Sequence, residues 1–361
     1  MRIGRRAFLQ STLAALTGAA VACASDASGD VRIERRATSS VVAASPGATA
    51  VPTAAVDPAI RIGAVGDLMF ARDITTLMLQ HGAGYPFERV RPLFEGLDFL
   101  VGNMEGTFTT RGSALTKTYT FRTPPELATG LTAAGFDLVA LANNHAFDFG
   151  SVSLEDTLAA LQRAGVVSVG AGTTEAAARA GYVAEVRGKR VAALSYSGVD
   201  ESGFATPGGP GVARATVEAV REDVQRLAPL ADYVLVFMHA GVEYTRAPSD
   251  LQRAIAYAAI ESGADVVIGS HPHVLQGWER HHDGLILYSL GNFVFDLDTD
   301  DLSNFGGPPF ETAVAVLTLR PDAPPAVEFR PAYIDPIEDR PRPATSDETA
   351  RVMAALREIP R

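Results

Sequence analysis

The chain has 361 residues, of which 47% are hydrophobic and 20% charged, so it has the composition of a folded protein with a substantial core. Its net charge of -11 argues against a nucleic-acid partner, because nucleic-acid binding needs a basic surface. The single cysteine, Cys23, excludes a disulfide framework and a Cys-ligated zinc site.

Residues 1–23 have the pattern of an export signal. Three arginines precede an apolar run from Ala7 to Ala22, which is shorter than a membrane span of about 20 residues. The Arg5-Arg6 pair resembles a twin-arginine signal, and the stretch ending at Cys23 resembles a lipoprotein cleavage box. We therefore predict an exported lipoprotein, held on the outer face of the cytoplasmic membrane through lipidated Cys23. Simple cleavage near Cys23 and a retained signal anchor are the alternatives.

The remainder divides into three parts. Residues 24–58 are rich in Ala, Ser, Thr, Gly and Pro without helical or strand periodicity, which predicts a disordered tether. Residues 59–340 form the predicted folded domain, and residues 341–361 a C-terminal helix or tail.

Within the domain, short apolar runs alternate with amphipathic stretches, which is typical of strands joined by helices in an α/β protein. The predicted strands are 60–65, 99–101, 138–142, 234–238, 266–268 and 285–288. The predicted helices are 124–134, 154–164, 216–227 and 251–261. The acidic run 296–301 lacks the glycine and distal glutamate of an EF-hand, so we expect a solvated loop there.

Potential metal ligands follow five of these strands. They are Asp67, then Asn103 and Glu105, then Asn144 and His145, then His239, and finally His271 and His273. Parallel strands end at a common edge, where α/β sheets bind ligands. Each residue alone would be an ordinary turn or surface residue, but together they predict a metal site at that edge. His81, His281 and His282 follow no such strand, and we expect them at the surface.

The ordered series resembles the metallophosphoesterase superfamily and, more narrowly, the CapA family of poly-γ-glutamate capsule biosynthesis proteins. The motifs are Gly66-Asp67-Leu68-Met69, Asn103-Met104-Glu105-Gly106, Asn143-Asn144-His145, His239-Ala240-Gly241-Val242-Glu243-Tyr244, His271-Pro272-His273 and Ser289-Leu290-Gly291-Asn292. The resemblance covers residues 60 to 320. It implies a four-layer α-β-β-α sandwich with two mixed sheets and a site for one or two divalent or transition metal ions, Mn, Fe or Zn.

The resemblance also implies a ligand set. One ion would be held by Asp67, a bridging acid and His273, and the other by the bridge, Asn144, His239 and His271. Glu105 is the favoured bridge because a group shared by two cations should carry charge, whereas strict strand register would select Asn103. The superfamily has a histidine where this chain has Met69, and a thioether is a poor ligand for these metals, so the first ion has at most three protein ligands.

The same resemblance assigns catalytic and substrate roles. His145 would protonate the leaving oxygen or stabilise its charge, and Asp148 would either orient His145 or cap the next helix. Arg72, Glu243 and Asn292 are weaker candidates for substrate contact.

Two functions remain open at this point. The first is an exported, membrane-tethered CapA-like protein with a metal-dependent hydrolase site of the phosphoesterase type. Its substrate would be a phosphoester or an anionic cell-envelope polymer. The second is a non-catalytic component that binds or exports poly-γ-glutamate within a synthesis complex, with capsule synthase components as partners.

Overall fold

The computed structural model describes residues 33–34, 59–200 and 203–359. The predicted export signal, including Cys23, lies outside these residues. So does the predicted tether, apart from strand β1 (Ile33–Glu34), which pairs in parallel with β9.

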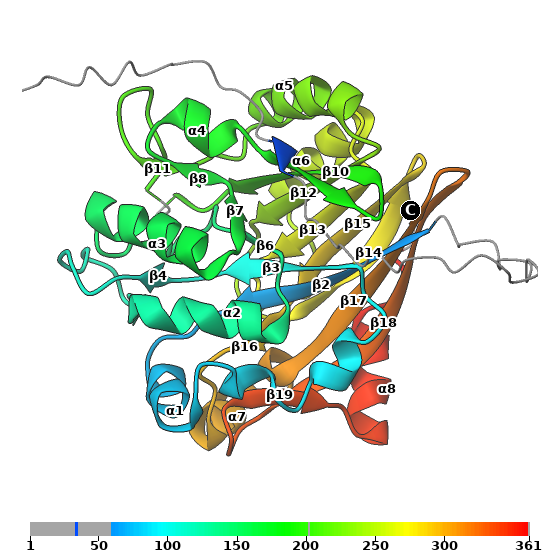
Figure 1. Ribbon diagram of the computed structural model, residues 1–361. Coiled ribbons are helices and arrows are strands. Elements are labelled where there is room, and N and C mark those ends of the chain that lie inside the picture. Colours follow the sequence, from blue (N-terminus) through cyan, green and yellow to red (C-terminus); the bar gives the residue numbers. More distant parts are fainter. Residues whose placement is uncertain (1–32, 35–58, 201–202, 360–361) are drawn as a thin grey trace, which may run out of the picture.

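Two mixed sheets form the centre of the molecule (Figure 1). The eight-stranded sheet has the order β19 (Arg340–Pro343), β18 (Ala323–Asp335), β17 (Glu311–Arg320), β2 (Ile60–Leu68), β3 (Phe99–Met104), β6 (Leu138–Ala140) and β7 (Val167–Val169), with β16 (Asn292–Val294) paired to β2. The seven-stranded sheet has the order β1, β9 (Tyr182–Val186), β10 (Lys189–Ser197), β12 (Tyr233–His239), β13 (Val266–Ser270), β15 (Gly284–Leu290) and β14 (Leu275–His281). In each sheet, parallel strands are flanked by antiparallel ones.

Helices cover the outer faces of both sheets. The eight-stranded sheet carries α1 (Asp73–His81), α2 (Thr129–Ala134) and α3 (Ser151–Ala164). The seven-stranded sheet carries α4 (Glu175–Arg179), α5 (Val217–Leu227) and α6 (Asp250–Glu261). Two further helices, α7 (Thr299–Phe305) and α8 (Ser346–Ala355), belong to the C-terminal part of the chain. There are also two small two-stranded sheets, β4 (Thr107–Phe108) with β5 (Arg122–Thr123) and β8 (Ala171–Gly172) with β11 (Gly211–Val212). Among the described helices, none combines the length and apolar character required to cross a bilayer.

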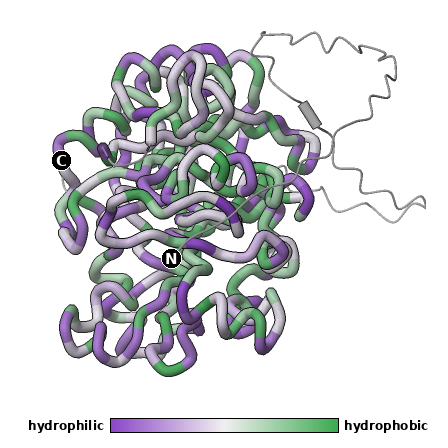
Figure 2. The backbone as a smooth tube through the Cα atoms, turned by 90° about the vertical axis from the view of Figure 1, so that its left-hand side faces the viewer, coloured by the Kyte–Doolittle hydropathy of each residue, from purple (hydrophilic) through white to green (hydrophobic). Residues whose placement is uncertain are grey.

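Alternation along the strands produces this layering. In β12, Tyr233, Leu235 and Phe237 belong to the core between the two sheets, whereas Val234 and Val236 pack under the outer helices. Successive side chains of a strand point to opposite faces, so a strand buried on both faces is apolar throughout. Hydrophobic stretches of the chain run through the interior and many outer turns are hydrophilic (Figure 2). The predicted four-layer α-β-β-α sandwich with two mixed sheets is therefore confirmed.

The C-terminal helix is part of the same core. Val352 and Leu356 are buried among residues of both sheets. Thr345 caps α8, and Glu348 completes the capping box, which fixes where the helix begins. The described part of the predicted tail thus packs onto the domain.

The acidic run after β16 differs from the expected solvated loop. Asp298 accepts hydrogen bonds from the backbone N–H groups of Asp300 and Asp301, and the Asp301 side chain accepts one from the Asp298 N–H. This reciprocal capping begins helix α7, because carboxylates satisfy the unpaired donors at a helix start.

The two sheets meet at the edge where their parallel strands end. The chain leaves β15 of one sheet through Gly291 and enters β16, which pairs with β2 of the other sheet. The Asp67 N–H donates to the Gly291 carbonyl at 2.9 Å, and a Cβ on Gly66 would lie 1.9 Å from that oxygen. Only glycine permits this close approach, which brings Asp67 and Asn292 together.

Candidate metal centre

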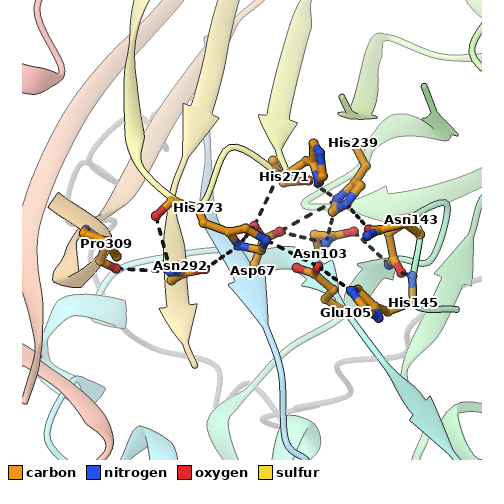
Figure 3. Close-up of polar contacts among 12 residues, drawn as sticks. Asp67, Asn103, Glu105, Asn143, His145, His239, His271, His273, Asn292 and Pro309 are labelled. Carbon is orange, nitrogen blue, oxygen red and sulfur yellow. Dashed lines mark hydrogen bonds and ion pairs between the residues drawn. The ribbon is translucent and has the colours of Figure 1, made fainter. Parts of the chain in front are cut away.

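Asp67 lies at the centre of the strand-end cluster. It is fully buried and aligned in register with Asn103 on β3 and Asn292 on β16. Its Oδ1 accepts a hydrogen bond from Asn103 Nδ2 at 2.8 Å, and its Oδ2 accepts one from the backbone N–H of His271 at 3.2 Å (Figure 3). Burial raises the pKa of Asp67, and the nearby His273 and the Asn103 hydrogen bond partly offset that increase.

Glu105 is a buried carboxylate without a hydrogen-bond partner. It is fully inaccessible, and within the described residues neither of its oxygens accepts a hydrogen bond. It lies in one group with Asp67 and His273, and its Oε1 is 3.9 Å from His273 Nε2 (Figure 3). Burial, reinforced by the carboxylates of Asp67 and Asp148, raises the pKa of Glu105 well above its ordinary value. A bound cation would supply the missing positive charge at this position.

A second group consists of Asn144, His239 and His271. His239 Nε2 is 2.7 Å from Asn144 Oδ1, and the rings of His239 and His271 have centroids 4.8 Å apart. His271 Nδ1 is buried and has no hydrogen-bond partner in the described part of the chain. Burial and the neighbouring His273 lower the pKa of His271 to about 3, and burial, together with His271, lowers the pKa of His239 well below its ordinary value. Both rings are therefore neutral at pH 7, the form in which imidazole binds metals.

The turn carrying His271 and His273 has an unusual backbone conformation. Both residues have positive φ angles, 95° and 55° respectively, in a region that side chains other than glycine rarely occupy. His273 Nδ1 lies 2.8 Å from Asn292 Oδ1, and the Asn292 Nδ2 donates to the carbonyls of His273 and Pro309. Since the amide oxygen can only accept, His273 donates through Nδ1 and keeps Nε2 available for a metal.

The donor set fits a transition metal. Carboxylates, an amide oxygen and neutral imidazoles converge, and three of their atoms (both oxygens of Glu105 and Nδ1 of His271) lack partners within the described residues. Met69 is fully buried in a small apolar cluster with Ala71 and Phe121, and its sulfur accepts the N–H of Ala71 at 3.0 Å. Its thioether is thus occupied by a backbone contact, and the prediction of at most three protein ligands for the first ion stays a prediction.

His145 stands beside this cluster in a fixed orientation. Its Nδ1 is 2.7 Å from Asp148 Oδ2, and its Nε2 is 3.8 Å from Glu105 Oε1. Burial lowers the pKa of His145, and the hydrogen bond to Asp148 opposes that decrease. Helix α3 begins at Ser151, and its N-cap residue, Gly150, provides no side-chain cap. Of the two roles left open for Asp148, the structure therefore favours orienting His145.

Sequence reasoning missed Lys117. Its side chain is buried, and its Nζ donates to Asp148 Oδ1 at 2.7 Å and to the backbone carbonyl of Asn144. Asp148 Oδ2 also accepts the N–H of Phe121 at 2.7 Å, so the carboxylate is held from several sides. One signal was available: the chain contains 31 basic residues, but only Lys117 and Lys189 are lysines.

The three substrate candidates have different positions. Arg72 Nε forms an ion pair of 2.8 Å with Asp296. Glu243 is exposed, and its carboxylate lies in one group with ring nitrogens of His271 and His273. Asn292 uses its amide atoms on His273 and Pro309, which favours positioning the imidazole over contacting substrate.

Comparison with known proteins places this geometry in a family context. A family model described as "Bacterial capsule synthesis protein PGA_cap" matches residues 61–297. The PGA biosynthesis protein CapA of Bacillus subtilis is 35% identical over 245 residues, which cover 66% of this chain and 64% of that protein. The capsule biosynthesis protein CapA of Bacillus anthracis is 33% identical over 241 residues, which cover 64% of this chain and 59% of that protein. The chain thus spans less than two thirds of the length of these relatives.

A solved structure with a lower level of similarity is the 5'-nucleotidase of Candida albicans. It is 11% identical, has a TM-score of 0.44 and covers 78% of this chain and 53% of that one. A resemblance of this size says nothing about activity.

Proposed function

The chain belongs to the family of bacterial capsule synthesis proteins described as PGA_cap, as its motifs predicted, and from that membership we propose a metal-dependent hydrolase of capsule or cell-envelope polymer biosynthesis. The reaction would be of the phosphoesterase type, on a phosphoester or on an amide bond of an anionic polymer such as poly-γ-glutamate. One observation supports the hydrolase more than any other. Glu105 is a fully buried carboxylate with no hydrogen-bond partner among the described residues, and it faces a set of metal-ligating side chains.

In the proposed site, Asp67 and His273 would hold one ion, Asn144, His239 and His271 would hold a second, and Glu105 could serve both. Glu105 remains our choice of bridge over Asn103. The amide nitrogen of Asn103 donates to Asp67 Oδ1 and lies 3.2 Å from His239 Nδ1, and a nitrogen that donates is not a metal ligand. The chemistry supplied by a divalent cation at these residues would be Lewis acidity and a water molecule whose pKa is lowered to about 7.

The residues around this site would then control the proton. Asp148 accepts from His145 Nδ1 and fixes the ring, so that Nε2 points toward Glu105 and the leaving oxygen of a bound substrate. Lys117 holds Asp148 in place and offsets its charge. In its protonated form, His145 would donate the Nε2 proton to the leaving oxygen and become neutral while keeping its Nδ1–H bond to Asp148. The surrounding buried residues Phe121 and Ala146 exclude bulk water.

The hydrolase is tested with full-length protein in detergent, loaded with manganese or zinc and assayed on p-nitrophenyl phosphate esters. We expect turnover that EDTA abolishes, and we expect His145→Ala to lower kcat by about 10²–10⁴-fold while leaving the metal content unchanged. His281→Ala is the control, since the half-buried His281 contacts Glu261 and Tyr257 and none of the candidate ligands. Absence of turnover by loaded protein, combined with a normal phenotype of His145→Ala cells, would leave the non-catalytic polymer-binding role as the better account.

The location of the protein is a second part of the proposal. Arg5-Arg6, the apolar run and Cys23 support export and acylation, with the protein anchored on the outer face of the cytoplasmic membrane near capsule synthase components. Cys23→Ser should release the protein from the membrane fraction. Continued tight association of this variant would exclude acylation as the anchor.

A further inference from the structure

A basic cavity lies beside the candidate metal centre. It has a volume of about 730 Å³ and is bordered by the segment after β12, the turn before β17, strands β17 and β18, and helix α8. Its polar lining includes Arg246, Glu311, Tyr333, Arg351 and Arg357. Pockets for small ligands and polymer segments commonly have volumes of about 300–1,000 Å³.

The arginines outnumber the acid they surround. Glu311 is buried, and its two oxygens accept from Arg246 Nη2 at 2.7 Å and Arg351 Nε at 3.3 Å. The side chains of Arg246 and Arg351 remain 42% and 50% exposed, so both guanidinium groups can donate further hydrogen bonds. Arg357 is exposed and has no ion pair within the described residues.

This local excess is unusual for the protein. Three arginines and one glutamate give the lining a charge of +2, whereas the whole chain carries -11. One arginine would suffice to neutralise Glu311. The remaining positive charge favours an anionic ligand, and a guanidinium can bind a carboxylate through two parallel hydrogen bonds.

Contacts through Tyr244 and Pro309 connect the cavity with the metal centre. Arg246 belongs to the same segment as Glu243 and Tyr244, which follow the predicted ligand His239. Tyr244 lies with its ring centroid 6.1 Å from that of His273 and stacks at 5.0 Å on Phe305 of α7, the helix whose Leu302 lines the cavity. On the other side, Asn292 bonds both His273 and the carbonyl of Pro309, next to the lining residue Pro308 (Figure 3).

We propose that this arginine cavity binds carboxylates of an anionic polymer whose neighbouring segment lies at the metal centre. The inference rests on the proposed function and specifies its substrate as a carboxylate-bearing chain such as poly-γ-glutamate. The acidic body repels such a polymer at long range, and the arginine cavity supplies the local attraction. Binding here orients the chain relative to His145 and Glu105.

Polymer binding can be measured without the metal. Full-length protein in detergent and EDTA is titrated with fluorescently labelled poly-γ-glutamate at low and physiological salt. We expect Arg357→Gln and Arg351→Gln each to weaken binding about tenfold, since each removes a charge-assisted hydrogen bond. Arg163→Gln is the matched control, because it removes the same charge from an exposed position on α3. Arg357→Gln touches no ion pair, so it remains informative if Arg351→Gln impairs folding.

Three results overturn the proposal. The first is wild-type affinity in both cavity variants, and the second is an equal loss of affinity in Arg163→Gln. The third is tighter, arginine-dependent binding of polyglycerol phosphate, which would make the cavity a phosphate site. Hydrolysis of p-nitrophenyl phosphate by the metal-loaded protein is scored separately. A protein that binds poly-γ-glutamate through these arginines but hydrolyses no ester therefore refutes the proposed function and leaves the arginine site intact.

Discussion

The strand-end edge and the C-terminal corner of this protein both bury a glutamate, with opposite electrostatic results. Glu348 accepts from Arg342 Nη1 and Nη2 at 2.7 and 2.9 Å and from the Thr345 N–H at 2.8 Å, and these contacts lower its pKa to about 2. Glu105 has no such partner in the described residues, and burial raises its pKa. A missing hydrogen-bond partner, rather than burial, therefore distinguishes a carboxylate that is available to bind a ligand.

A surface cluster supports the same distinction. Glu261, His281 and His282 are close enough to hold a metal, as are Asp67, Glu105 and His273. However, His281 Nε2 already bonds Glu261 at 3.1 Å, and its ring stacks on Tyr257 with centroids 4.1 Å apart. The side chains of this cluster thus satisfy one another. His282 is exposed as predicted, whereas His281 is half-buried at the end of β14.

The strongest test of the comparison is Glu105→Gln, which should have opposite effects with and without metal. We expect metal affinity to fall by more than about 100-fold, beyond the loss typical of an outer-sphere residue. In EDTA the variant should be more stable than wild type by about 1–3 kcal/mol, because a buried carboxyl group whose pKa is raised in the folded state destabilises the protein at neutral pH. Metal analysis and thermal unfolding measure the two effects, with His281→Ala as control. A variant that keeps its metal, or is destabilised in EDTA, would remove Glu105 from the site.

Lys117→Met tests Asp148, the carboxylate at the same edge that does have a cationic partner. Asp148 would lose its cationic partner while buried, so we expect a loss of about 3 kcal/mol in the free energy of unfolding. Urea denaturation measures the loss, and Asp148→Asn in the same chain should restore part of it. If Lys117→Met unfolds at the wild-type urea concentration, the ion pair does not stabilise the protein.

Asn292→Ala tests whether the predicted ligand His273 depends on its hydrogen bond to Asn292. Without the amide oxygen, His273 loses the acceptor that fixes its ring, and we expect metal affinity to fall about 10–100-fold. Competition with a fluorescent chelator measures the change. The exposed Asn304→Ala on α7 should bind metal like wild type, and equal affinities in the two variants would show that Asn292 does not position His273.

The smallest effect should appear at Glu348, as a dependence of stability on pH. Its pKa is depressed in the folded state, so its contribution is complete above its ordinary value of 4.5 and disappears as the pH falls toward 2. We expect Glu348→Gln to reduce the free energy of unfolding by about 2 kcal/mol at pH 7 and much less at pH 3. A difference between wild type and variant that is constant across this range would contradict the assignment.

Much of the fold could be predicted from the sequence, because apolar runs report burial and polar residues mark strand ends. The six predicted strands are all present, and the four predicted helices overlap α2, α3, α5 and α6, with a 3-10 turn, Pro125–Ala128, preceding α2. The ligand candidates meet because five of those strands end at one edge. The long β17–β18 hairpin was missed. Exposed residues interrupt the apolar pattern of β18, whereas β17 is buried along most of its length and its apolar run was overlooked.

The remaining features depend on contacts between distant segments. Lys117 belongs to an irregular stretch, and its ammonium group forms an ion pair with the distant Asp148. No local hydrophobic period in the sequence predicts this contact. Arg72 was predicted as a candidate for substrate contact. At the start of α1 its guanidinium group instead pairs with Asp296, which follows β16. The missing partner of Glu105 likewise becomes visible only when every neighbour has been placed.

The hydrogen bond between the His271 N–H and Asp67 joins residues 204 positions apart. No short fragment of the chain contains both sides of the cluster, so the binding geometry arises only after the two sheets have docked. Only completely folded molecules would therefore bind a cation. The ratio of bound metal to protein would then measure the folded fraction of any preparation.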